Sequence, residues 1–206
     1  MFSPAALGEF IIAAVVAFAL HRPHVVAPSI ATAAALFAAA SRPDRFATLT
    51  VGPGPALVPL AVGPDLRGWT HMDTDTDTVD NDLSRPRARV IELLSHIQRH
   101  ELEDEVREDY LRSYDGDRLT GTHLYWRRLR HELPALVQLL PKILVPTLII
   151  AGRQDRLIPW RNAEFLHQSL PGSQLSCVDA GHFVWEDAAE QYAVLVRDWW
   201  EEYNSP

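Results

Sequence analysis

The sequence predicts an α/β fold, with a mostly parallel sheet of about four strands flanked by helices and a helical insert in the middle. Three observations predict it. Short β-branched runs alternate with helical patterns near both ends of the chain. The middle of the chain has amphipathic helical patterns with no strand signal. Hydrophobic residues make up 47% of 206 residues, which is ample for a core.

The first elements are a helix, a strand, a second helix and a second strand. We expect the first helix over residues 5–20 to be buried, since its run of eleven apolar residues at 10–20 is too short to span a bilayer. Glu9 before that run, and the lack of a basic segment, argue against a signal peptide. Residues 24–27 (HVVA) predict a strand, the alanine-rich residues 30–41 a helix, and residues 47–54 a strand that ends in Gly-Pro-Gly.

The middle of the chain predicts a separate unit. Residues 65–82 are acidic and of low complexity, and three helical patterns separated by Asp, Gly and Pro follow them. We therefore expect two domains, a core formed by residues 1–63 and 143–206 and a helical insert formed by residues 64–142. No internal repeat is found.

The acidic stretch also resembles the start of a calcium-binding loop, with Asp73, Asp75 and Asp77 as the first ligands. The sixth position is Thr78 rather than glycine, and the twelfth is Ser84 rather than glutamate. We interpret the stretch as a solvated, mobile lead into the insert.

The last third predicts two more strands, each followed by a helix. Residues 145–152 (VPTLIIAG) read as a buried strand, 162–170 as a helix, 173–181 as a strand, and 186–203 as a closing helix. Cys177 is expected to be a strand residue rather than a reactive thiol.

Charge and cysteine content restrict the function. The net charge is −8, which argues against a nucleic-acid or anionic-membrane binder because both need clustered Lys and Arg. The one cysteine excludes an internal disulfide and suits a reducing cytoplasm. We expect a cytoplasmic protein that acts on a small molecule, with no cofactor and no metal.

Candidate catalytic residues follow three of the four predicted strands. The carboxyl ends of parallel strands gather at one edge of a sheet, where functional groups usually lie. Ser29 follows the first strand, Asp155 the third and His182 the fourth. In that arrangement histidine would remove the serine proton, and a carboxylate would orient the imidazole and stabilise its charged form.

The surroundings of Ser29 fit a nucleophile on a sharp turn. Ala27 and Ala31 are small, as a close approach of strand and helix backbones requires. The N–H of Ile30, at the start of the helix, would donate to an oxyanion. Taken singly, Ser29 reads more readily as a helix cap, Asp155 as a turn residue and His182 as a loop histidine. Their coincidence at matched strand ends favours a triad.

These motifs resemble the α/β-hydrolase superfamily from residue 5 to the end of the chain. The segment VPTLIIAGRQDRLIP looks like the acid strand and loop, AGHFVWED like the histidine loop, and HVVAPSIATAAALFAAASRPDRFATLTV like the nucleophile elbow with its helix and next strand. The resemblance implies that residues 64–142 form the helical cap, or lid, of that family. Tyr125, Trp126, Trp69 and Tyr110 in the cap would then line an apolar pocket or form part of the core.

Two features depart from the family pattern. The elbow reads Ala-Pro-Ser-Ile-Ala where the motif is Gly-x-Ser-x-Gly. The family fold begins with about four strands and a loop that supplies an oxyanion donor. The resemblance therefore implies a partial fold that lacks the N-terminal strands and one oxyanion donor, or a longer protein whose start was placed too late.

The resemblance implies a serine hydrolase of esters or related carbonyl compounds, weakened by the missing half. Two alternatives stay open. One is different chemistry on the same fold, such as carbon–carbon bond hydrolysis, cofactor-free peroxidation or dehalogenation. The other is a non-catalytic or partner-completed remnant. Because residues 24–27 would form an open sheet edge, we also expect homo-oligomers or aggregates through that edge.

Overall fold

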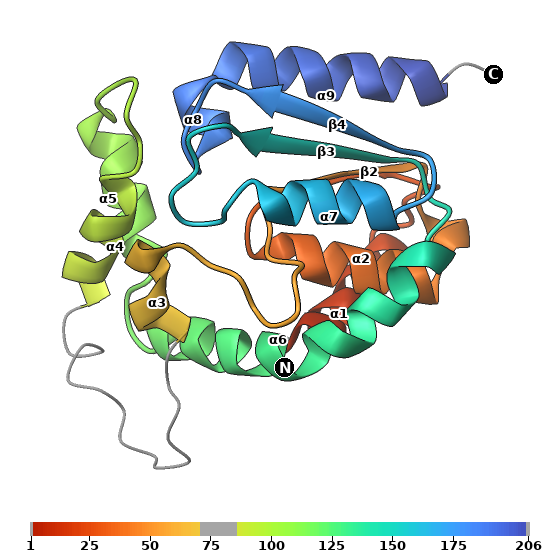
Figure 1. Ribbon diagram of the computed structural model, residues 1–206, viewed down its shortest axis with the longest axis horizontal. Coiled ribbons are helices and arrows are strands. Elements are labelled where there is room, and N and C mark those ends of the chain that lie inside the picture. The colour runs from red at the N-terminus through yellow and green to blue at the C-terminus, as the bar shows by residue number, and fades with distance from the viewer. Residues whose placement is uncertain (1, 71–85, 205–206) are drawn as a thin grey trace.

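The core of the protein is a four-stranded parallel sheet (Figure 1). The computed structural model describes residues 2–70 and 86–204. The strands β1 (His24–Ala27), β2 (Thr48–Val51), β3 (Thr147–Gly152) and β4 (Ser173–Val178) lie in the order β1-β2-β3-β4. Each neighbouring pair is parallel. The predicted α/β class and strand number are confirmed, although β2 and β4 end three residues earlier than expected.

Helices cover both faces of the sheet, as the alternation of side chains along β3 requires. Leu148 and Ile150 pack with Val196 and Trp199 of α9 (Ala189–Asn204). Ile149 and the other core residues of the opposite face pack with α2 (Ala31–Ser41) and α7 (Arg161–Ser169). Figure 1 shows α9 on one side of the sheet and α2 and α7 on the other.

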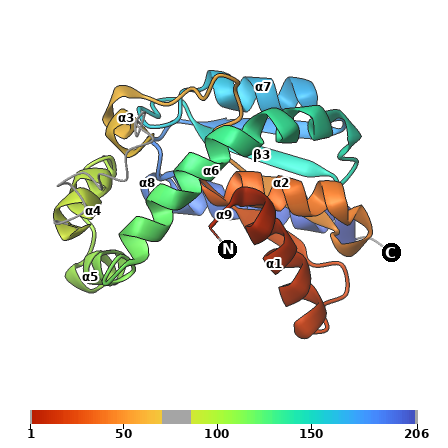
Figure 2. The ribbon, with the colours of Figure 1, turned by 90° about the horizontal axis from the view of Figure 1, so that it is seen from below.

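The first helix differs from its prediction in length and burial. Helix α1 spans Pro4–Ala17, and the chain turns after it through Ala19, which has a φ of 51°. The helix packs against α2 on one face, while Phe10 and Val16 on another are 63% and 56% exposed. Figure 2 shows α1 at the periphery, on the side of α2 opposite α7. The expectation of a buried helix was therefore wrong, because α2 and α6 cover only part of its surface and leave Phe10 and Val16 exposed.

The described part of the insert is helical, with no strand between residues 64 and 142. Its helices are α3 (Pro64–Thr70), α4 (Pro86–Leu94), α5 (Asp104–Arg112) and α6 (Arg118–Leu139). Asp73, Asp75 and Asp77 lie outside the described residues. Figure 1 shows α4 and α5 beyond the carboxyl ends of the strands, and α6 running back along α1 and α2. Leu129, Leu133 and Leu136 of α6 are buried in the main core, so the insert is fixed to it.

The remaining elements are short. Two 3₁₀ turns, η1 (Pro43–Arg45) and η3 (Leu140–Lys142), follow α2 and α6. The predicted closing helix is divided into α8 (Val184–Asp187) and α9, because Ala188 between them has non-helical dihedral angles. Of the helices that the structure describes, none is long and apolar enough to cross a membrane.

Candidate active site

Ser29 lies on a strained turn between β1 and α2. Its φ is 52°, in the left-handed region that costs a non-glycine residue about 1–2 kcal/mol. The N-cap of α2 is Ile30, and the Ser29 Oγ lies instead 2.8 Å from Nε2 of His182. Strain of this kind persists where surrounding contacts impose it, as in the sharp turns that expose a nucleophile.

Thr32 supplies such contacts. Its Oγ1 donates to the carbonyl of Ala27 at 3.1 Å and accepts the N–H of Gly52 at 3.0 Å. One buried hydroxyl therefore joins the end of β1, the first turn of α2 and the end of β2. Thr32 could not be recognised from the sequence, because neither of its partners follows from local pattern.

Asp155 is held in a fixed orientation by its own loop. Its Oδ1 accepts the N–H groups of Leu157 and Ile158, both at 2.8 Å. Its Oδ2 lies 2.8 Å from Nδ1 of His182, and the carboxylate is almost completely buried. Both carboxylate oxygens are thus engaged, and only Oδ2 faces the imidazole.

His182 joins the other two candidate residues. Its side chain is only 6% exposed, and the rings of Phe183 and Trp185 stand edge-on to it, with centroids 5.3 and 6.1 Å away. When Nδ1 donates its proton to Asp155, Nε2 is left as the acceptor for the Ser29 hydroxyl. The structure therefore brings together all three residues that the sequence singled out at strand ends.

The loops that carry Asp155 and His182 touch through their backbones. The N–H groups of Arg153 and Gln154 donate to the carbonyls of Val178 and Ala180 at 2.8 and 3.0 Å. A Cβ added to Gly152 would lie 2.0 Å from the carbonyl oxygen of Gly181. Only glycine at the end of β3 allows this approach, which sets the distance between the two loops.

The insert contributes directly to the elbow. The Tyr125 hydroxyl of α6 donates to the Ile30 carbonyl at 2.5 Å, and burial raises the pKa of Tyr125. Beside this contact lies an open apolar cavity of about 460 Å³, lined by α1, the start of α2 and α6.

The aromatic residues of the insert that were named from the sequence lie in different places. Tyr125 lines this cavity, Trp126 is buried in the core, and Tyr110 is hydrogen-bonded to Glu186. The side chain of Trp69 lies outside the described residues.

A polar cavity of about 360 Å³ lies between the insert and the Asp155 loop, lined in part by Asp65, His96 and Arg156. Burial lowers the pKa of His96, and Asp65, whose Oδ2 lies 3.7 Å from Nε2, partly opposes this shift. His96 lies just after the end of α4. Its position here depends on long-range packing and leaves no local signal.

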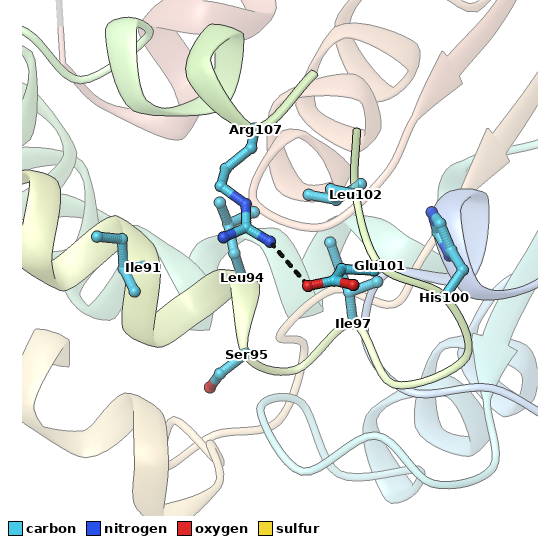
Figure 3. A pocket seen from close by; sticks show the side chains of 8 residues that line it. All are labelled: Ile91, Leu94, Ser95, Ile97, His100, Glu101, Leu102 and Arg107. Carbon is cyan, nitrogen blue, oxygen red and sulfur yellow. Dashed lines mark ion pairs between the residues drawn. The ribbon is translucent and has the colours of Figure 1, made fainter. Parts of the chain in front are cut away.

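A third cavity, of about 270 Å³, lies within the insert between α4 and α5 (Figure 3). Arg107 and Glu101 face each other across it, with an N–O distance of 4.0 Å, and Ile91 and Leu94 form an apolar wall. None of the three candidate catalytic residues lines it. Over residues 2–70 and 86–204, no group of three or more His, Cys, Asp or Glu side chains is arranged to hold a metal ion.

Comparison with known proteins gives a family and distant relatives. A family model described as alpha/beta hydrolase fold matches residues 5–189. A magnesium-chelatase 30 kDa subunit from Rhodobacter capsulatus is 36% identical over 70 residues, which cover 34% of this chain and 25% of that protein. A pimeloyl-[acyl-carrier protein] methyl ester esterase from Neisseria meningitidis is 42% identical over 64 residues, which cover 31% and 25%. Each of these two matches thus spans a quarter of the relative's length.

A solved structure agrees with the fold. A meta-cleavage product hydrolase from Pseudomonas fluorescens IP01 superposes with a TM-score of 0.73 over 98% of this chain and 73% of that one. The two sequences are 17% identical, so the similarity concerns the fold alone.

Proposed function

The chain belongs to the alpha/beta hydrolase fold family, and from that premise we propose that it hydrolyses esters or related carbonyl compounds with Ser29 as nucleophile. One observation carries the proposal. A continuous hydrogen-bonded series runs from Ser29 Oγ through His182 to Asp155, with both distances at 2.8 Å. These distances lie within the range expected of a nucleophile, its base and the group that orients the base.

The proposed reaction has two halves. The Ser29 oxygen bonds to the substrate carbonyl carbon while its proton passes to Nε2 of His182, and Asp155 stabilises the resulting imidazolium. The Ile30 N–H donates to the oxyanion. The intermediate collapses, and the leaving group takes the proton from Nε2, which leaves an acyl-enzyme. Water then attacks the acyl carbon and gives a proton to Nε2 of His182. The bond between the acyl carbon and the Ser29 oxygen breaks, His182 returns the proton to Ser29, and the carboxylic acid departs.

We assign the helical insert, residues 64–142, as a cap over a core formed by residues 1–63 and 143–206. The support is the position of α6, whose Tyr125 bonds the elbow and lines the apolar cavity beside Ile30. That cavity is large enough for a small organic group, since ligand pockets hold about 300–1,000 Å³.

Ester hydrolysis is preferred to the other reactions considered. The curated relative from Neisseria meningitidis is an esterase, which supports a carbonyl ester substrate. The meta-cleavage product hydrolase shares the fold at low identity, so it gives carbon–carbon hydrolysis no specific support. Serine in place of aspartate at the elbow disfavours dehalogenation.

The direct test is turnover of p-nitrophenyl acetate and butyrate by the purified chain. We expect release of p-nitrophenolate above the buffer rate, at modest turnover, because Ile30 is the one oxyanion donor we assign and each donor contributes about 10²–10³ in rate. Heat-denatured protein at the same concentration is the control. Equal release by native and denatured protein would favour the non-catalytic alternative.

We further propose that the chain associates with itself through the β1 edge. In the described sheet β1 pairs only with β2, Val26 is 39% exposed, and Val25 and Val26 carry no charge that would deter pairing. Light scattering at micromolar concentration should therefore give a mass above 23.1 kDa. Val26→Lys should return the chain to a monomer. A monodisperse, cooperatively melting wild-type monomer would refute self-association.

A further inference from the structure

A buried carboxylate outside the proposed triad joins the insert to the His182 loop. Asp187, the last residue of α8, is 9% exposed. Its Oδ1 accepts the backbone N–H groups of Gln98 and Arg99 at 2.8 and 3.0 Å, and its Oδ2 accepts that of Gly181 at 3.2 Å. Gln98 and Arg99 belong to the insert, whereas Gly181 immediately precedes His182.

These three hydrogen bonds make the insert and the loop interdependent. Burial of a carboxylate is strongly unfavourable unless hydrogen bonds or opposite charges compensate it. Two of the three N–H groups come from the insert, so moving residues 98–99 away would leave Asp187 poorly compensated. The folded chain is therefore most stable when residues 98–99 of the insert and Gly181 are all hydrogen-bonded to Asp187.

A second contact acts on the same loop. The Tyr110 hydroxyl of α5 donates to Oε1 of Glu186 at 2.5 Å and accepts the indole N–H of Trp185 at 3.2 Å. Burial and the Glu186 hydrogen bond raise the pKa of Tyr110 to about 12, so it stays a neutral donor at physiological pH. The insert thus contacts the loop on both sides of His182 in the sequence.

The backbone beside His182 has no side chain of its own to hold it in place. A Cβ on Gly181 would lie 3.0 Å from the His96 carbonyl oxygen and 3.2 Å from Oδ2 of Asp187. The loop is therefore pressed against the insert at this residue. Gly181 immediately precedes His182, whose imidazole lies between Ser29 and Asp155.

We propose that Asp187 is a positioning residue, which holds the His182 loop against the insert so that the imidazole reaches both Ser29 and Asp155. The inference rests on the proposed function. Asp187 touches neither substrate nor the reacting atoms and acts through Gly181. A displacement of about 1 Å in catalytic geometry can cost 10²-fold in rate, which is the scale of effect expected here.

The test compares Asp187→Asn with Asp179→Asn. In Asp187→Asn, the amide oxygen can still accept the N–H groups of Gln98 and Arg99, but the NH₂ group then faces the N–H of Gly181. Two hydrogen-bond donors face each other there, so the bond to Gly181 is lost. We expect kcat for p-nitrophenyl acetate to fall about 10²-fold with KM within about twofold, since substrate binding is not altered. Asp179 lies on the same loop and pairs with Arg99 of the insert, but is exposed, so its substitution should change kcat little.

A second readout separates positioning from general destabilisation and from failure of the proposed function. In wild type the Nδ1 proton of His182 should give a far-downfield proton NMR signal, assigned by its loss in His182→Ala. Asp187→Asn should weaken or shift this signal, whereas Asp179→Asn should not. If the chain proves inactive but the signal responds to Asp187→Asn, positioning stands and the proposed function fails.

The opposite result overturns the inference alone. If the wild type hydrolyses the ester, and Asp187→Asn keeps kcat within threefold and the signal unchanged, Asp187 has no positioning role. Should Asp187→Asn fail to fold, Asp187→Glu takes its place, because it keeps a charged acceptor at an altered reach. We expect it to lower kcat about tenfold at unchanged KM, and wild-type kcat in a folded Asp187→Glu would likewise contradict the proposal.

Discussion

Ser29→Ala is expected to reduce hydrolysis of p-nitrophenyl acetate to the rate in buffer. The substitution removes the oxygen that lies 2.8 Å from Nε2 of His182 and would form the acyl-enzyme. In efficient serine hydrolases loss of the nucleophile costs about 10⁶ in kcat, so an enzyme of modest turnover should lose all measurable activity. Initial rates at matched protein concentration measure the effect.

Two further variants make this result specific. Ser41→Ala changes a serine at the far end of α2 and should keep wild-type turnover. Ser29→Gly should be equally inactive. Its free energy of unfolding in urea should nevertheless be about 1 kcal/mol higher, because glycine adopts a φ of 52° without strain. Undiminished hydrolysis by Ser29→Ala would mean that the activity arises elsewhere.

Asp155→Asn is expected to lower kcat by about 10⁴ while leaving the fold intact. The orientation of the new amide is fixed, because the N–H groups of Leu157 and Ile158 require an oxygen at the Oδ1 position. The NH₂ group would then face Nδ1 of His182 and force that nitrogen to act as acceptor. The imidazole proton would lie on Nε2, which could no longer take the proton of Ser29.

Asp198→Asn is the control, since it removes an exposed carboxylate that pairs with Arg197 on α9. It should leave kcat and the thermal midpoint unchanged. Comparable kcat in Asp155→Asn and wild type would exclude Asp155 as the orienting group, even with Ser29 essential.

The strand pattern predicted the fold and the candidate site residues. The strands, and the residues that directly follow them, can be recognised from local sequence. The β-branched runs at 24–27 and 147–150 form the whole of β1 and the first four residues of β3, and all four strands run parallel. Since parallel strands end at the same edge of the sheet, residues following three of them lie together. The family match over residues 5–189 agrees with this interpretation.

Other features depend on contacts between segments far apart in the chain. Thr32 and Tyr125 support the elbow through bonds to Gly52 and Ile30. Nothing in the alanine-rich run around Thr32, or in the helical pattern around Tyr125, indicates those partners. The exposed face of α1 was not predicted either. The sequence pattern of an apolar helix does not show whether one face or both faces are covered by other elements.

If Ser29 is the nucleophile, a reagent that traps nucleophilic serines should form a covalent adduct on it. The wild-type chain is incubated with a fluorophosphonate, digested and analysed by mass spectrometry, with Asp155→Asn and Ser41→Ala treated in parallel. We expect one phosphonylated residue, Ser29, with wild-type labelling in Ser41→Ala and much slower labelling in Asp155→Asn. A native chain that remains unlabelled, or that is labelled at another residue, would contradict it.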